Sequence, residues 1–128
     1  IAPMIEKNMA KIDWENYDSK KIKNLVRGLN PILGAYTNLN DKKIKFWKVQ
    51  TMSISEFVGK FEEYQEFEYR LKEMEPGYAI IADEKSGLYI KALDGIISVI
   101  EIQGENARKM HVSDFLRGTK LEVGIKFE

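Results

Sequence analysis

Three short apolar runs in the second half of the sequence constrain the fold more than any other feature. Residues 78–82, 88–92 and 96–103 are rich in Ile, Val and Tyr, and Gly87 and Asp94-Gly95 separate them. β-branched and aromatic residues favour strands, whereas glycine and aspartate favour tight turns. Because parallel strands need crossover helices and these gaps are too short for them, the pattern predicts three consecutive antiparallel strands.

The first half of the sequence predicts a helix and a hairpin. Asp18 or Ser19 can cap the helix, and Pro31 ends it. Four apolar residues at i, i+3, i+4 and i+7 give this helix one buried stripe: Ile22, Leu25, Val26 and Leu29. Residues 35–39 and 43–50 then flank Asn40-Asp41, which predicts a hairpin.

The middle and the end of the chain carry weaker signals. Ser53 and Glu56 form a possible capping box and predict a helix over 55–64, whereas residues 65–73 fit both the helical and the strand period. Near the end, Ser113 is a candidate cap for a short helix over 114–117. A final strand is expected over 121–127.

These elements amount to about six strands and two or three short helices. The expected fold is therefore mainly β, in the form of a partly open Greek-key barrel of the OB-like kind. A chain of 128 residues with 44% hydrophobic residues supports one core. Without cysteine there is no disulfide or thiolate metal site, and there is no apolar run of the roughly 20 residues that a membrane-spanning helix needs.

The sequence begins with Ile1-Ala2-Pro3 rather than with methionine, which suggests a piece of a longer polypeptide. Residues 1–14 are expected to be a linker leading into the domain, with Ile12 and Trp14 as its first anchors, and residues 15–128 are expected to be the domain itself.

Charge is segregated although the net charge is zero. Residues 1–50 contain ten Lys or Arg against five Asp or Glu, and residues 51–75 contain three against seven. A concentration of positive charge is the pattern either of a solvated lysine-rich face or of a surface that binds phosphates. The acidic segment is expected to lie outside a phosphate-binding surface. Five basic residues on the predicted helix and hairpin are the candidate binding residues: Lys20, Lys23, Arg27, Lys43 and Lys45.

Catalytic and metal-binding patterns are absent from the sequence. His111 is the only histidine, and no nucleophile motif accompanies it, so it is interpreted as a structural or exposed residue. The adjacent carboxylates at 62–63 and 83–84 point apart and do not form an acid/base pair. No glycine-rich phosphate loop is present. The chain alone is therefore expected to hold no cofactor and to have no catalytic activity.

An ordered set of short motifs resembles the carboxyl-terminal domain of the methionyl-tRNA formyltransferases. The first half supplies Ile12-Asp13-Trp14, the run from Asn24 to Pro31, and Ala35-Tyr36-Thr37. The second half supplies Pro76-Gly77, residues 87–90, Asp94-Gly95, Ile102-Gln103 and residues 114–118 in the same order as the family. Two positions depart from its pattern, because Met4 stands where a linker lysine is usual and Leu33 where a second proline is common.

The resemblance implies a cytoplasmic two-domain enzyme that moves a formyl group from 10-formyltetrahydrofolate to the amino group of methionyl initiator tRNA. It places the chemistry and the folate in an amino-terminal domain and makes this chain the tRNA-binding domain. Two alternatives stay open. Other folate-dependent formyltransferases and hydrolases share a similar second domain, and a free-standing OB-like module can bind oligonucleotides.

Overall fold

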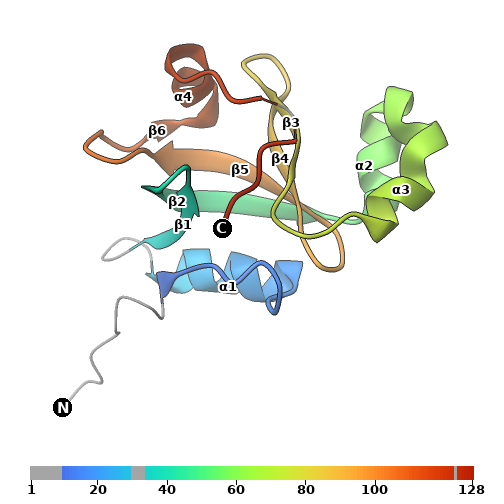
Figure 1. The fold of residues 1–128 in the computed structure, drawn as a ribbon, viewed down its shortest axis with the longest axis horizontal. Coiled ribbons are helices and arrows are strands. Elements are labelled where there is room, and N and C mark those ends of the chain that lie inside the picture. Colours follow the sequence, from blue (N-terminus) through green and yellow to red (C-terminus); the bar gives the residue numbers. More distant parts are fainter. Residues whose placement is uncertain (1–9, 30–33, 123) are drawn as a thin grey trace.

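The computed structural model describes residues 10–29, 34–122 and 124–128. Residues 1–9 of the linker expected over 1–14, and the expected turn at Asn30-Pro31, lie outside the described residues. The elements follow one another in this order (Figure 1): α1 Ser19–Leu29, β1 Ala35–Leu39, β2 Lys42–Met52, α2 Ile54–Lys60, the 3-10 helix η2 Glu62–Phe67, α3 Glu68–Glu73, β3 Ala79–Asp83, β4 Gly87–Lys91, β5 Ile96–Gln103, β6 Met110–His111 and α4 Val112–Gly118.

The strands form one sheet in the order β1-β2-β5-β4-β3, with β6 paired to β5, and every pairing between these strands is antiparallel. This confirms the antiparallel arrangement that the punctuated runs predicted. The helical content is higher than expected, because the described residues contain four α-helices and the 3-10 helix η2 rather than two or three short helices. The fold is therefore mixed α/β rather than mainly β.

The predicted final strand over 121–127 is wrong. Among the described residues of this segment, only Lys126 forms a β-bridge, and its partner is Tyr78. Gly124 has φ +89°, a left-handed conformation that interrupts an extended strand. The segment nevertheless connects the two ends of the sheet, since the Phe127 N–H donates to the Gly77 carbonyl and the Glu128 N–H donates to the Asn38 carbonyl.

Helix α2 begins as the sequence predicted. Ser53 Oγ accepts a hydrogen bond from the Glu56 N–H at 3.0 Å, and the Glu56 carboxylate accepts one from the Ser53 N–H at 3.2 Å, which confirms the capping box. The helix ends at Lys60, however, rather than at residue 64. The ambiguous residues 65–73 are helical and belong to η2 and α3.

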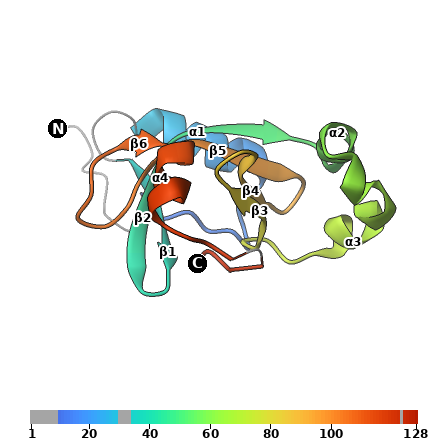
Figure 2. The ribbon, with the colours of Figure 1, turned by 90° about the horizontal axis from the view of Figure 1, so that it is seen from above.

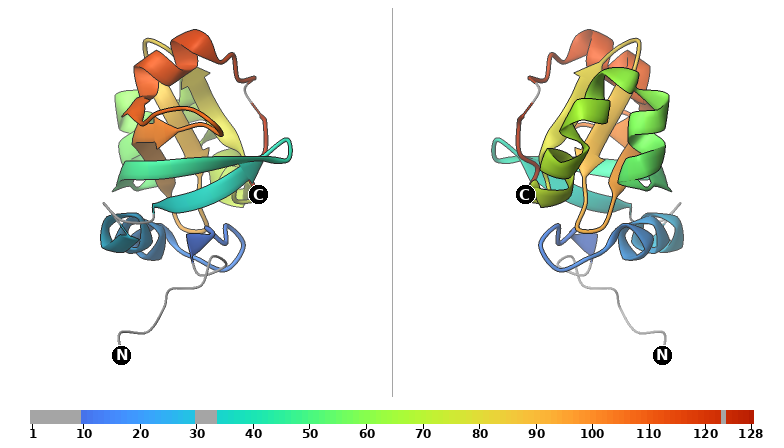
Figure 3. Two further views of the ribbon diagram at one scale, coloured as in Figure 1. Left: turned by 90° about the vertical axis from the view of Figure 1, so that its left-hand side faces the viewer. Right: turned by 90° about the vertical axis from the view of Figure 1, so that its right-hand side faces the viewer.

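Two hydrophobic clusters lie on opposite faces of the sheet. The larger one joins α1, β1, β2 and the segment before α1, and it includes Ile12, Trp14, Ile22 and Phe46. The smaller one is built around Phe57, which packs against Phe61, Tyr64 and Tyr89. Helices α2 and α3 lie together at one end of the molecule (Figures 2 and 3). Within the described residues, no helix has the length and hydrophobicity that crossing a bilayer requires.

Candidate functional site

Helix α1 presents a basic strip to solvent. Successive residues of an α-helix are rotated by about 100°, so positions 20, 23 and 27 fall within a sector of about 60°. Lys20, Lys23 and Arg27 are all exposed, whereas Ile22 and Val26 are buried on the opposite side. The helix thus separates its positive side chains from its core-facing stripe, as the sequence pattern predicted.

Local hydrogen bonds fix the two ends of this strip. The Asp18 carboxylate accepts a hydrogen bond from the Lys21 N–H at 2.8 Å, so Asp18 caps the first turn. At the other end, Arg27 donates to the Asn24 side-chain oxygen at 3.1 Å. That neutral partner leaves the charge of the guanidinium uncompensated in this contact, and a guanidinium can bind phosphate through two hydrogen bonds.

The β1–β2 hairpin carries the other candidate residues. Its turn residues Asn40 and Asp41 have φ of 50° and 66°, the left-handed pair that a tight two-residue hairpin requires. Lys43 and Lys45 alternate along β2 and therefore lie on one face, while Ile44 and Phe46 point into the core.

Aromatic rings hold both lysine side chains in place. The Lys43 ammonium lies 4.4 Å from the centre of the Tyr36 ring, and the Lys45 ammonium lies 5.9 Å from the centre of the Trp47 indole. A cation over an aromatic face is attracted by the ring quadrupole. These contacts keep the two ammonium groups on the outer face of the hairpin, and the uncharged rings do not neutralise their positive charge.

The five candidate residues form two groups. Lys20, Lys23 and Arg27 share one side of α1, and Lys43 and Lys45 share one face of β2. Helix α1 packs against β2, but within the described residues no hydrogen bond or ion pair between side chains joins the two groups. Trp47 packs closely against Gly34, the first described residue after α1, because a Cβ on Gly34 would approach its indole to 3.0 Å.

Two further residues near the hairpin were missed by sequence reasoning. The Trp47 indole N–H donates to the Gln103 side-chain oxygen at 2.9 Å, and the Lys109 ammonium lies 5.1 Å from the centre of the Trp47 ring. Gln103 ends β5, and Lys109 precedes β6. Their proximity to β2 depends on strand pairing over more than fifty residues, so no local pattern signals it.

The acidic segment lies away from the hairpin. Helices α2 and α3 follow the end of β2 that is opposite to the Asn40-Asp41 turn, and Figure 2 shows them at the far end of the molecule. The glutamates Glu62, Glu63 and Glu66 of η2, between these helices, and Glu73 of α3 are exposed. The structure therefore places most of the negative charge of residues 51–75 apart from Lys43 and Lys45.

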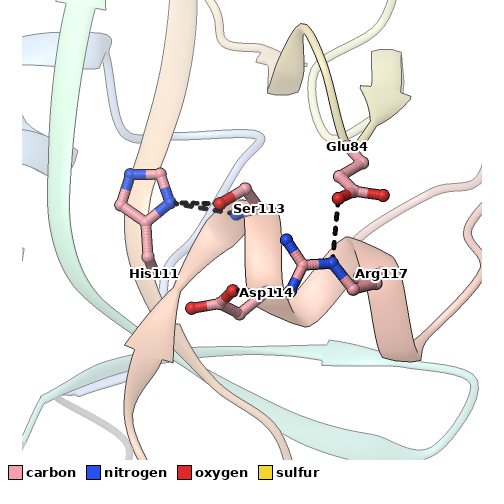
Figure 4. A network of polar contacts seen from close by, with 5 residues as sticks. All are labelled: Glu84, His111, Ser113, Asp114 and Arg117. Carbon is pink, nitrogen blue, oxygen red and sulfur yellow. Dashed lines mark hydrogen bonds and ion pairs between the residues drawn. The ribbon is translucent and has the colours of Figure 1, made fainter.

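His111 has a structural role at the start of α4 (Figure 4). Its Nδ1 accepts a hydrogen bond from the Ser113 N–H at 3.1 Å, which makes His111 the cap of α4 and corrects the prediction that Ser113 is the cap. Arg117 on the same helix pairs with Glu84 at 2.8 Å and with Asp114 at 3.3 Å, and both pairs are exposed. The contact with Glu84 attaches α4 to the β3–β4 turn.

Metal ligands do not gather in the part of the chain that the structure describes, where no group of three or more His, Cys, Asp or Glu side chains is placed to hold an ion. The Ser113 hydroxyl lies 2.8 Å from His111 Nδ1, the same nitrogen that accepts the Ser113 N–H, so the two residues together form the cap of α4. This pairing stabilises the start of the helix. The basic surfaces of α1 and the hairpin are thus the strongest candidate for a functional site.

Comparison with known proteins gives a consistent result. The family model described as "Formyl transferase, C-terminal domain" matches residues 4–120. The methionyl-tRNA formyltransferase of Ruminiclostridium cellulolyticum is 36% identical over 125 residues, which cover 98% of this chain and 35% of that relative. The enzyme of the same name from Carboxydothermus hydrogenoformans is 35% identical over 127 residues, with 99% and 35% covered. The chain therefore spans about a third of the length of these relatives.

Solved structures share the fold at lower identity. HypX from Aquifex aeolicus, crystallised with tetrahydrofolic acid, superposes with a TM-score of 0.62 at 17% identity. The match covers 89% of this chain and 17% of the HypX chain. At this identity the similarity supports the fold only.

Proposed function

Because the chain belongs to the formyl transferase C-terminal domain family, we propose that it is the tRNA-binding domain of a methionyl-tRNA formyltransferase. The relatives that carry this name align with nearly the whole chain. In the proposed enzyme, a separate amino-terminal domain of the same polypeptide binds 10-formyltetrahydrofolate and transfers its formyl group to the amino group of methionyl initiator tRNA. The present chain contributes binding and orientation of the tRNA rather than chemistry.

The observation that carries this proposal is the exposed basic strip of α1 together with the two lysines on the hairpin. Folded tRNA consists largely of A-form helices, whose deep major groove hides the base edges, so a protein binds them mainly by shape and phosphate contact. Lys20, Lys23, Arg27, Lys43 and Lys45 supply positive charge for that contact. Buried aromatic residues such as Trp14 and Phe46 serve the core and do not offer stacking platforms for single-stranded bases.

The proposal also covers the barrel architecture of the domain and the role of its amino-terminal segment. The hydrogen bonds that join residues 124 and 125 to Ala79 of β3 and residue 128 to Asn38 of β1 support a partly open, OB-like barrel, in which the carboxyl-terminal segment spans the gap between the two end strands. Residues 1–14 act as the interdomain linker, whose last residues, including Ile12 and Trp14, pack into the domain of residues 15–128. A cytoplasmic location follows from the tRNA substrate.

The proposal is tested by comparing the binding of this chain to folded initiator tRNA with its binding to single-stranded RNA of the same length. We expect preference for the folded tRNA and a logarithm of affinity that falls with the logarithm of salt concentration by about 0.7 to 0.9 per phosphate contact. The chain alone is expected to show no formyl transfer with 10-formyltetrahydrofolate and charged tRNA. Equal or tighter binding of single strands would favour an oligonucleotide-binding module instead.

A further inference from the structure

Trp47 is buried outside both hydrophobic clusters of the protein. Its side chain is only 8% exposed, yet it belongs to neither the large core nor the cluster around Phe57. Its contacts include two lysines and an amide, namely Lys45, Lys109 and Gln103. The indole therefore contacts polar groups from β2, from β5 and from the loop between β5 and β6.

Gln103 connects Trp47 to the loop between β5 and β6 by two hydrogen bonds. Its side-chain oxygen accepts the Trp47 indole N–H, and its side-chain nitrogen donates to the Ala107 carbonyl at 2.8 Å. A second bond, from the Ala107 N–H to the Gly104 carbonyl at 3.2 Å, closes the turn, and Asn106 adopts φ +60° inside it. The loop over 104–109 is therefore fixed beside the hairpin, as Figure 1 shows, and it carries Lys109 with it.

A carboxylate already occupies the space between this loop and the hairpin. The Lys43 backbone N–H donates to Glu105 Oε2 at 3.0 Å. Around this contact lies a hollow of about 170 Å³, lined by Lys43, Lys45, Gln103, Gly104, Glu105 and Asn106. A backbone N–H beside lysine side chains is the combination with which proteins hold phosphate groups of nucleic acids.

We infer that this hollow is a binding site for one phosphodiester group of the tRNA backbone, and that the Glu105 carboxylate holds its place in the unbound protein. On binding, a phosphate oxygen replaces Glu105 as the acceptor of the Lys43 N–H, and the phosphate lies against Lys43 and Lys45 of the hollow's lining. Lys109, beside Trp47, adds a further positive charge next to the hollow. Trp47 and Gln103 are positioning residues for Lys109. This inference rests on the proposed function and adds a defined site and an exchange of anions to it.

The exchange is feasible because the contact of Glu105 is exposed. Exposed ionic contacts contribute little net stability, so replacement of one anion by another disturbs the fold little. The carboxylate also competes with RNA, since its negative charge must move before a phosphate enters. Removal of that charge should therefore strengthen tRNA binding.

The first experiment compares Glu105→Gln with the unaltered chain. We expect the affinity for folded initiator tRNA to rise about threefold to tenfold, with the same salt dependence, because both proteins make the same number of phosphate contacts. Glu62→Gln, which removes the same charge from the acidic end of the molecule, is the matched control and should leave affinity and salt dependence unchanged. Equal affinity of Glu105→Gln and the unaltered chain would overturn the inference.

The second experiment follows the Lys43 amide in ¹H–¹⁵N correlation spectra during titration with tRNA and, separately, with inorganic phosphate. Its resonance should shift with tRNA, and at lower tRNA concentration in Glu105→Gln. A response to inorganic phosphate without any response to tRNA would overturn the assignment to RNA. Gln103→Leu should keep the fold by circular dichroism but reduce the salt dependence by about one contact, because Lys109 is no longer positioned.

Failure of this inference is distinguishable from failure of the proposed function. If the Lys43 amide and Glu105→Gln do not respond while variants of Lys20, Lys23 and Arg27 weaken binding, the domain binds tRNA through α1 and the hollow is not a phosphate site. If the unaltered chain does not bind folded tRNA at all, both proposals are wrong.

Discussion

The carboxylate of Asp94 accepts hydrogen bonds from the backbone N–H of Ser19 at 2.8 Å and from the Ser19 hydroxyl at 3.2 Å. The two residues are 75 positions apart, so the turn between β4 and β5 holds the first turn of α1. A negative charge at a helix N-terminus also interacts favourably with the helix dipole. The basic strip of α1 is thereby fixed in direction relative to the sheet.

Replacement of Asp94 should loosen this attachment. We expect Asp94→Ala to lower the free energy of unfolding by about 1 kcal/mol, the usual effect of losing a helix cap, and to weaken tRNA binding slightly although no phosphate contact is removed. Urea unfolding measures the first effect. Glu122→Ala removes an exposed carboxylate elsewhere and should change stability by less than about 0.5 kcal/mol; equal losses in the two variants would contradict a capping role.

Reversal of charge at Arg27 should weaken tRNA binding more than any other single change on α1. We expect Arg27→Glu to reduce the affinity for initiator tRNA about tenfold, because it removes a two-point phosphate contact and introduces repulsion. Lys85→Glu, on the exposed β3–β4 turn at the opposite side of the sheet from α1, is the matched control. Binding titrations across salt concentrations measure both variants. If the slope of log affinity against log salt concentration is unchanged in Arg27→Glu, the tRNA-binding surface does not include Arg27.

The acidic end of the molecule should not contribute to the affinity for tRNA. Deletion of residues 53–75 is unsuitable as a test, because α2 and α3 cover the buried side chains of Ile80, Tyr89 and Ile96. Neutralisation is cleaner: the triple change of Glu62, Glu63 and Glu66 to Gln should leave the affinity within about twofold, since exposed charges beyond about 10 Å are screened at 0.1 M salt. A fivefold loss of affinity in the folded variant would show that this end contacts the tRNA.

The buried lysine of β4 predicts a pH dependence of stability. Lys91 is 1% exposed, and burial lowers the pKa of its ammonium group, while the nearby Asp94 carboxylate raises it by less. The charged form is thus disfavoured in the folded state at neutral pH. This penalty disappears as the pH rises through the lowered pKa toward 10.5, the ordinary value of the unfolded chain.

We therefore expect Lys91→Met to be at least as stable as the unaltered chain at pH 7, since an apolar residue of similar size avoids the penalty. Its advantage should shrink as the pH is raised toward 10.5. Thermal unfolding of both proteins over a pH series measures the difference. An advantage that stays constant with pH would mean that Lys91 is not the titrating group.

The sequence was sufficient for the elements whose signals are local. Residues 96–103 and 35–39 match β5 and β1, and the capping box at Ser53 marks the start of α2. The punctuated runs predicted these strands because some of their boundaries coincide with residues in a left-handed conformation: Asn40 and Asp41 separate β1 from β2, and Gly87 begins β4.

The misses have tertiary causes. Residues 65–73 are helical because Leu71 packs into the cluster around Phe57, a contact that neither periodicity reveals. The helix cap at α4 is a histidine because β6 runs directly into the helix and leaves His111 at the cap position. Lys109 and Gln103 were missed because only strand pairing places them next to Trp47.

Strand β4 is enclosed on every side. It pairs with β3 on one edge and with β5 on the other, Leu88 and Ile90 point into the large core, and Tyr89 points into the smaller cluster. Local opening therefore cannot expose its amides without breaking both hydrophobic clusters. The amide protons of β4 should be the slowest in the chain to exchange with deuterium, and their protection should report the free energy of complete unfolding.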